Sequence, residues 1–174
     1  RGYDSSGLVI LSQDNKLVRE RAAGKVSNLE NNLKLKKPSL KANVGLAHTR
    51  WATHGNPSVN NAHPHISKTS ISVVHNGIIE TYIDLKDLQM KQGYAFTSET
   101  DTEVIAHAIE SAIKPSDSLL KATQKAIKTL NGSYGIGVLS SKYTDQIIAA
   151  RKGSPLVIGI GDNGNYVASD QMAL

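Results

Sequence analysis

The order of strand-like and helix-like segments is the feature that most constrains how this chain folds. Short apolar or alternating runs come first, at residues 7–11 and 16–24, amphipathic helical patterns fill much of residues 82–130, and strand-like runs return from residue 133 onward. Short polar turns separate neighbouring strand-like runs, as in antiparallel hairpins, whereas parallel strands need a long crossover. We therefore expect an α+β chain whose helices pack on a mainly antiparallel sheet.

Residue-level signals place several ends of these elements. Ser27 and Glu30 have the spacing of a capping box, which predicts that a helix begins at Ser27. Ser116 is expected to cap the last long helix, and Gly93 to end the helix over residues 82–92.

Composition narrows the chemistry that these residues can supply. The 174 residues include no cysteine, so they provide no disulfide, no thiolate ligand and no cysteine nucleophile. No apolar run approaches the ~20 residues that cross a bilayer, and we expect a cytoplasmic protein without a membrane partner. The net charge is +5, with a basic run at 34–41, but the chain has one phenylalanine and no known nucleic-acid motif. A solvated lysine-rich loop is therefore favoured over a nucleic-acid surface.

The two ends of the sequence suggest a piece of a longer chain. The first residue is Arg1 rather than methionine, and the last stretch, SDQMAL, has the pattern of the first turn of a helix, capped by Ser169 or Asp170. We expect a domain truncated at both ends.

Polar residues gather where the expected strands end and where a helix begins. Four clusters lie at strand ends: RGYDS at 1–5, HTRWATHG at 48–55, HPH at 63–65 and HNG at 75–77. A fifth, SETDTE at 98–103, lies at the start of a helix. Arg50 is able to hold a carboxylate through paired hydrogen bonds, and Asp101 to hold an ammonium group, which together would bind an α-amino acid. The alternatives are that Trp51 and its neighbours only pack, and that the acidic residues only favour a helix N-terminus.

Asn76 and Gly77 allow two interpretations. Asn-Gly after an apolar run is the commonest hairpin turn, which predicts that the strand ends there. The asparagine amide and the glycine N–H are also two neighbouring donors, and such a pair stabilises charge on a carbonyl oxygen as an oxyanion hole.

The histidines raise the possibility of a metal site. His63 and His65 together with His48, His54 or His75 would provide enough ligands for zinc. A proline separates the first two, however, and the chain has no H-E-x-x-H pattern. We therefore expect no metal and no other cofactor.

Five of these motifs, RGYDSSG, HTRWATHG, NAHPH, VVHNGIIE and SETDTEV, occur in one order and at one spacing. Together they resemble the glutaminase domain of the glutamine–fructose-6-phosphate aminotransferases, within the N-terminal-nucleophile glutamine amidotransferases. The resemblance covers essentially the whole chain. It implies a four-layer α/β/β/α sandwich of two antiparallel sheets between helices, with residues 1–174 forming an incomplete type-2 glutaminase domain.

The resemblance also implies roles for particular residues. The residues that match substrate-binding positions, or lie beside them, are Arg50, Trp51, Thr53, His54, Asp101, Arg1 and Gly2. Arg50 matches the arginine that binds the glutamine carboxylate, Asp101 the residue that holds the α-amino group, and Trp51 the gate of the ammonia path. Asn76 and Gly77 match the oxyanion hole.

One departure from the family pattern limits what these residues can do alone. The family uses an N-terminal cysteine that attacks the glutamine amide, forms a thioester and releases ammonia. Since the 174 residues contain no cysteine, we expect them to bind glutamine or glutamate without hydrolysing the amide. The parent enzyme would make glucosamine 6-phosphate from fructose 6-phosphate, using a sugar isomerase domain absent here, as a homodimer. The alternative is an amino-acid-binding or regulatory module of the same fold without catalysis.

Overall fold

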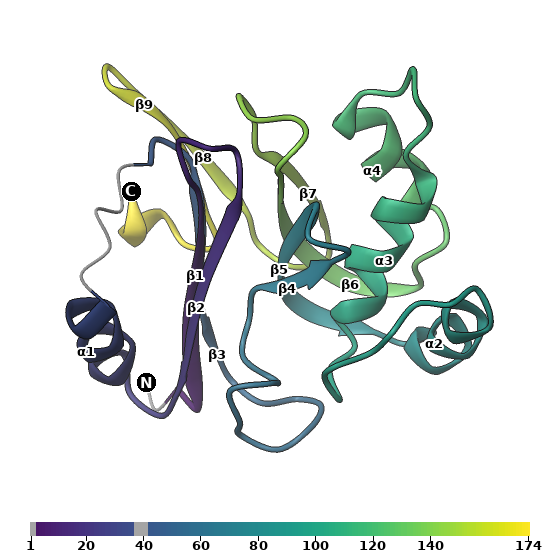
Figure 1. Cartoon of the computed structure of the whole chain (residues 1–174), viewed down its shortest axis with the longest axis horizontal. Coiled ribbons are helices and arrows are strands. Elements are labelled where there is room, and N and C mark those ends of the chain that lie inside the picture. The colour runs from purple at the N-terminus through teal and green to yellow at the C-terminus, as the bar shows by residue number, and fades with distance from the viewer. Residues whose placement is uncertain (1–2, 37–41) are drawn as a thin grey trace.

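Two antiparallel sheets lie face to face, with helices on both outer sides (Figure 1). The computed structural model describes residues 3–36 and 42–174. In Figure 1 one helix, α1 (Val26–Lys36), lies outside the first sheet, and the three helices between residues 82 and 127 lie outside the second. The α+β class and the four-layer α/β/β/α arrangement are thereby confirmed.

The first sheet has the strand order β2-β1-β3. Its strands are β1 (Ser5–Leu11), β2 (Leu17–Ala23) and β3 (Gly45–Arg50). The first two form the expected hairpin, paired antiparallel over their full lengths. The helix that follows begins at Val26, so Ser27 lies inside its first turn and the expected helix start at Ser27 is wrong by one residue.

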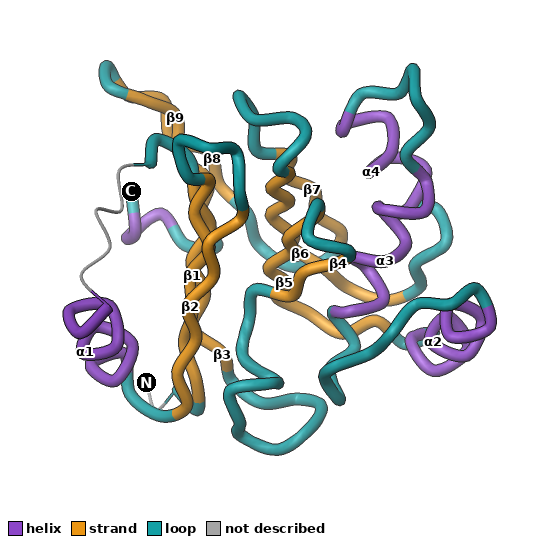
Figure 2. Tube along the Cα trace, viewed as in Figure 1, coloured by secondary structure: helices purple, strands orange, loops and turns teal. Residues whose placement is uncertain are grey.

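The second sheet has the strand order β4-β5-β6-β7 and is antiparallel throughout. Figure 2 shows its strands in orange, between the first sheet and the outer helices. Its strands are β4 (His65–Ser67), β5 (Ile71–Ile79), β6 (Gly132–Ser140) and β7 (Ile148–Lys152). The two long central strands, β5 and β6, are separated in sequence by all the helices of the outer layer. Their nine-residue pairing holds the sheet together.

The outer helices of the second sheet are α2 (Tyr82–Lys91), α3 (Glu103–Ala112) and α4 (Leu119–Ile127). Gly93, with φ +87°, follows the end of α2 as expected. The expected cap at Ser116 is wrong: Ser118 has extended backbone, and its side chain accepts a hydrogen bond from the N–H of Lys121.

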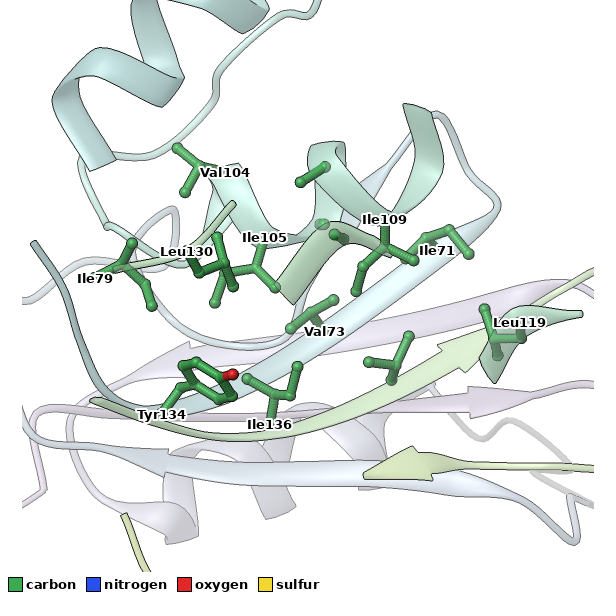
Figure 3. Close-up of a cluster of buried hydrophobic side chains, with 14 residues drawn as sticks. Ile71, Val73, Ile79, Val104, Ile105, Ile109, Leu119, Leu130, Tyr134 and Ile136 are labelled. Carbon is green, nitrogen blue, oxygen red and sulfur yellow. The ribbon is translucent and has the colours of Figure 1, made fainter. Parts of the chain in front are cut away.

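The main core lies between the second sheet and the helices (Figure 3). Alternate residues of β6, among them Tyr134, Ile136 and Val138, point to the helices and meet Ile105 and Ile109 of α3 in one buried cluster. Leu139 points the other way and packs with Val9 and Leu11 of the first sheet. This alternation lets one strand contribute to both cores.

A further hairpin ends the described chain. It consists of β8 (Val157–Gly161) and β9 (Gly164–Ala168), followed by a 3₁₀ turn, η1 (Gln171–Ala173), that Asp170 caps through the N–H of Met172. Among the described residues, no helix has the length and apolar content needed to cross a membrane.

Candidate active site

Asn76 and Gly77 lie inside β5, and the expected hairpin turn is wrong. Asn76 pairs with Gly135 and Gly77 with Tyr134, and β5 runs on to Ile79. The local turn signal loses to pairing with a strand more than fifty residues away. Gly77 has φ +136°, a conformation that favours glycine, and a Cβ there would clash with the carbonyl oxygen of Ser133.

The register of β5 and β6 sets which backbone N–H groups of β5 face the open edge of the sheet. The N–H of Glu80 donates to the carbonyl of Asn131 at 2.9 Å, so even-numbered residues of β5 make the ladder bonds with β6. Odd-numbered N–H groups therefore point away from β6. Beyond the short β4, no strand pairs with that edge in the described structure.

Side chains from two loops cap this edge on both sides of Gly77. The N–H of His75 donates to Nδ1 of His63 at 3.3 Å, and the N–H of Ile79 donates to Oδ2 of Asp101 at 2.8 Å. Gly77 stands between them in the same alternation, and its N–H has no acceptor among residues 3–36 and 42–174. One free donor is therefore held between two paired ones.

The Asn76 side chain supplies a second donor beside it. Its Oδ1 lies 2.9 Å from Nε2 of His48 on β3, while Nδ2 has no partner within the part of the chain that the structure describes. The residue is exposed. An amide N–H and a backbone N–H on adjacent residues are able to stabilise a developing oxyanion.

Asp101 lies in the segment that leads into α3 and is 3% exposed. While Oδ2 accepts from Ile79, Oδ1 accepts no hydrogen bond from the described residues and lies 4.0 Å from Nδ1 of His54. The same carboxylate is paired with no lysine or arginine of the described chain. A buried carboxylate with one free oxygen fits a small cationic group.

Arg50 lies at the end of β3 and is 4% exposed. Its guanidinium contacts Oδ1 of Asp4 at 3.3 Å and donates to the carbonyls of His54 and Gly55. Arginine has five N–H donors, so part of the group is used to hold the loop and part remains.

The other predicted binding residues of this loop are more open. Trp51 is 66% exposed, and Thr53 is exposed. His54 stands edge-on to Tyr82 with ring centroids 5.0 Å apart. Of these residues, His54 lies near Asp101, with Nδ1 4.0 Å from Oδ1. Arg1 and Gly2 lie outside the described residues.

Four histidines stand behind the open edge as neutral rings. Burial lowers the pKa of His48 and His75, and lowers the pKa of His63 and His65 further below the usual histidine value. In the described chain, no three His, Asp or Glu side chains converge as metal ligands would.

The hydrogen bonds of three groups fix the proton positions in this cluster. Nδ1 of His63 accepts from a backbone N–H, so its proton belongs on Nε2 and is donated to the Thr102 hydroxyl, 3.3 Å away. That hydroxyl then donates to Nδ1 of His75 at 3.0 Å, and His75 directs Nε2–H toward the carbonyl of Ser133. These bonds need no charged ring.

Sequence reasoning missed Glu103 as an organiser of the site. This carboxylate is 2% exposed and accepts hydrogen bonds from the N–H groups of Thr97 and Ser98 and from both hydroxyls. These hydrogen bonds hold residues 97–103 in place, the segment that carries Asp101. In the sequence, Glu103 is one of several acidic residues at a helix start, which indicates only a favourable interaction with the helix dipole. Its burial, which sets it apart from exposed acidic residues, depends on tertiary packing.

Comparison with known proteins shows the family of this chain. Residues 48–174 match the model of the glutamine amidotransferase domain. The chain belongs to the glutamine amidotransferase family. Two proteins named glutamine–fructose-6-phosphate aminotransferase (isomerizing), from Haemophilus influenzae and Pseudomonas putida, are 52% and 51% identical to it over 174 residues. The alignments cover the whole chain and 28% of each relative, so this amidotransferase chain spans little more than a quarter of their length.

Two solved structures have a similar fold. Glutamine phosphoribosylpyrophosphate amidotransferase from B. subtilis, in complex with ADP and GMP, superposes with a TM-score of 0.79 at 25% identity, over 99% of this chain and 37% of its own. A structure described as the allosteric regulatory enzyme of purine biosynthesis gives a TM-score of 0.76 at 26% identity, over 95% of this chain and 35% of its own.

Proposed function

We propose that these residues form the glutamine-binding part of a glutamine–fructose-6-phosphate aminotransferase. The full enzyme would release ammonia from glutamine and use it to convert fructose 6-phosphate to glucosamine 6-phosphate. The observation that carries the proposal is the unpaired N–H of Gly77, held at the open sheet edge beside the free amide of Asn76. The relatives' names support the choice of reaction.

Asn76 and Gly77 would hold the oxygen of the glutamine amide as it gains negative charge. Both donors sit on a central strand, so they need no rearrangement when charge develops, and preorganised donors of this kind lower an activation barrier most effectively. Removing one such donor typically slows the chemical step by ~10²–10³-fold.

Asp101 would bind the α-amino group through its free oxygen. Its other oxygen is held by Ile79, which fixes the carboxylate relative to β5. Arg50 would use its remaining donors for the α-carboxylate, with Thr53 and His54 beside it. Trp51, exposed on the same loop, would close over the site.

The nucleophile would come from outside these 174 residues, which contain no cysteine. A thiol there would attack the amide carbon, give a thioester and release ammonia, and water would then release glutamate. The partners in this scheme are a sugar isomerase domain that receives the ammonia and a second copy of the full protein.

The test uses the full-length gene product and two substrates. Asp101→Asn keeps an acceptor for Ile79 but removes the charge, so kcat/KM for glutamine should fall about 10- to 100-fold. The same variant should leave kcat/KM for 4-carbamoylbutanoate, which lacks the α-amino group, unchanged. Asp84→Asn, at an exposed position of α2, is the matched control.

Two results would contradict the proposal in different ways. An equal loss of kcat/KM on both substrates would contradict the proposal that Asp101 binds the α-amino group. Binding of glutamine without hydrolysis by the full-length protein would favour the alternative, an amino-acid-binding module.

A further inference from the structure

We propose that His48 is a positioning residue, which holds the Asn76 amide so that its Nδ2 donors face the substrate. This inference rests on the proposed glutaminase function. His48 lies on β3 of the first sheet and Asn76 on β5 of the second, so the contact joins the two sheets. Nε2 of His48 is 2.9 Å from Oδ1 of Asn76.

The proton of the His48 ring belongs on Nε2. Its Nδ1 is buried and has no partner among the residues that the structure describes. A proton on Nδ1 would make no hydrogen bond of normal length and angle, whereas a proton on Nε2 points at the oxygen of Asn76. Burial also lowers the pKa of the ring, which keeps it neutral with this single proton.

A donor at Nε2 selects one of the two orientations of the asparagine amide. With Oδ1 toward His48, the hydrogen bond forms and Nδ2 is free for a substrate oxygen. With the amide reversed, two N–H groups would meet at His48, and Oδ1 would face the oxygen that gains negative charge. The exposed Asn76 side chain has no other partner in the described chain to make this choice.

His48 is itself held in place by His63. The two rings stack with centroids 4.2 Å apart and planes 20° apart. His63 is fixed in turn by the N–H of His75 and the hydroxyl of Thr102. The orientation of the amide is thus tied to the same cluster that caps the sheet edge, and this supplies the preorganisation that an oxyanion hole requires.

Glutamine hydrolysis by the full-length gene product tests the inference. His48→Phe keeps a ring to stack on His63 but removes the N–H. We expect kcat to fall by about 10- to 100-fold, with KM for glutamine changing less than about threefold, since only an interaction of the transition state is weakened. His48→Gln retains an N–H donor and should keep kcat within about threefold of wild type.

A double-mutant cycle separates positioning from a general structural effect. In an Asn76→Ala background there is no amide to orient, so His48→Phe should then change kcat by less than about twofold. His107→Phe, a buried substitution on α3 that removes a bond to Ser67 of β4, controls for loss of a buried histidine. If His48→Phe prevents folding, His48→Leu takes its place.

The outcomes are distinguishable. If the wild-type protein has no glutaminase activity, both the proposed function and this inference are contradicted. An active wild type with kcat unchanged in His48→Phe, or with the same loss of kcat in both backgrounds, overturns the inference alone.

Discussion

Asn61 and Glu99 hold each other by two reciprocal hydrogen bonds. Nδ2 of Asn61 donates to Oε2 of Glu99 at 2.9 Å, and the N–H of Glu99 donates to Oδ1 of Asn61 at 2.9 Å. Asn61 also donates to the carbonyl of Asn56, whose N–H reaches the same Glu99 oxygen at 3.3 Å. The loop after β3 is thereby tied to the segment that carries Asp101.

Asn61→Ala should therefore destabilise the fold and loosen both loops. The substitution leaves the Glu99 N–H and the Asn56 carbonyl without these partners, at a cost of about 1–3 kcal/mol. Urea unfolding measures the loss, and hydrogen exchange at the Glu99 amide should become faster. Asn60→Ala, at an exposed neighbouring side chain, should change stability by less than about 0.5 kcal/mol. Equal effects of the two substitutions would contradict this role.

Gly77→Ala should destabilise the protein far more than Gly93→Ala. Both glycines have positive φ, at +136° and +87°, so each substitution strains the backbone by about 1–3 kcal/mol. Only at Gly77 would the added Cβ meet the backbone of Ser133, while at Gly93 the described structure leaves the space open. Thermal unfolding of the two variants measures the difference. Equal losses would mean that β5 shifts away from Ser133 at no cost.

Much of the fold could be predicted because its signals are local. Three features follow from periodicity or from a special backbone conformation: the β1–β2 hairpin, the helix pattern around Ile105 and Ile109, and the end of α2 just before Gly93. The order of the layers came only from the resemblance to a family. The turn expected at Asn76 and Gly77 is wrong because this local signal loses to pairing with a distant strand.

The candidate site could be predicted in its residue types but not in its contacts. The arginine, the aspartate and the Asn-Gly pair were visible as polar residues at the ends of strands. Two contacts depend on how the sheets stack. Arg50 donates to carbonyls of its own loop, and His48 forms a hydrogen bond with Asn76 between the two sheets. The sequence carries no short-range signal for either contact. The substrate roles of these residues stay predictions.

Arg21 should contribute to stability by holding the loop before β4. From β2 it donates to the carbonyls of Asn60 and Ala62 at 2.9 and 2.8 Å. Burial and the nearby Arg19 lower the pKa of Arg21 to about 10, so the guanidinium stays charged near neutral pH. Arg21→Met keeps the aliphatic stem but removes both bonds, which should cost about 1–3 kcal/mol in urea unfolding. Arg151→Met, at an exposed position of β7, is the matched control, and a similar loss there would contradict the prediction.

Stability should fall steeply as the pH drops below about 6.5. Five histidines have a pKa that burial lowers in the folded chain: His48, His63, His65, His75 and His107. Below their ordinary pKa of about 6.5 the unfolded chain binds protons that the folded chain excludes, so protonation favours unfolding. Above that pH both states are neutral at these positions and the full stability is present.

The slope of the free energy of unfolding against pH depends on how many histidines are involved. Each one contributes up to ~1.4 kcal/mol per pH unit, so urea unfolding between pH 6.5 and 5 should show a slope several times that of a single group. His107→Gln keeps an amide that is able to bond to Ser67 and removes one titrating ring, which should lower the slope by about one proton. A flat profile between pH 8 and 5 would mean that the rings accept protons in the folded state. The neutral hydrogen-bond network that links His63, Thr102 and His75 would then be wrong, because a protonated His63 has no lone pair to accept the N–H of His75.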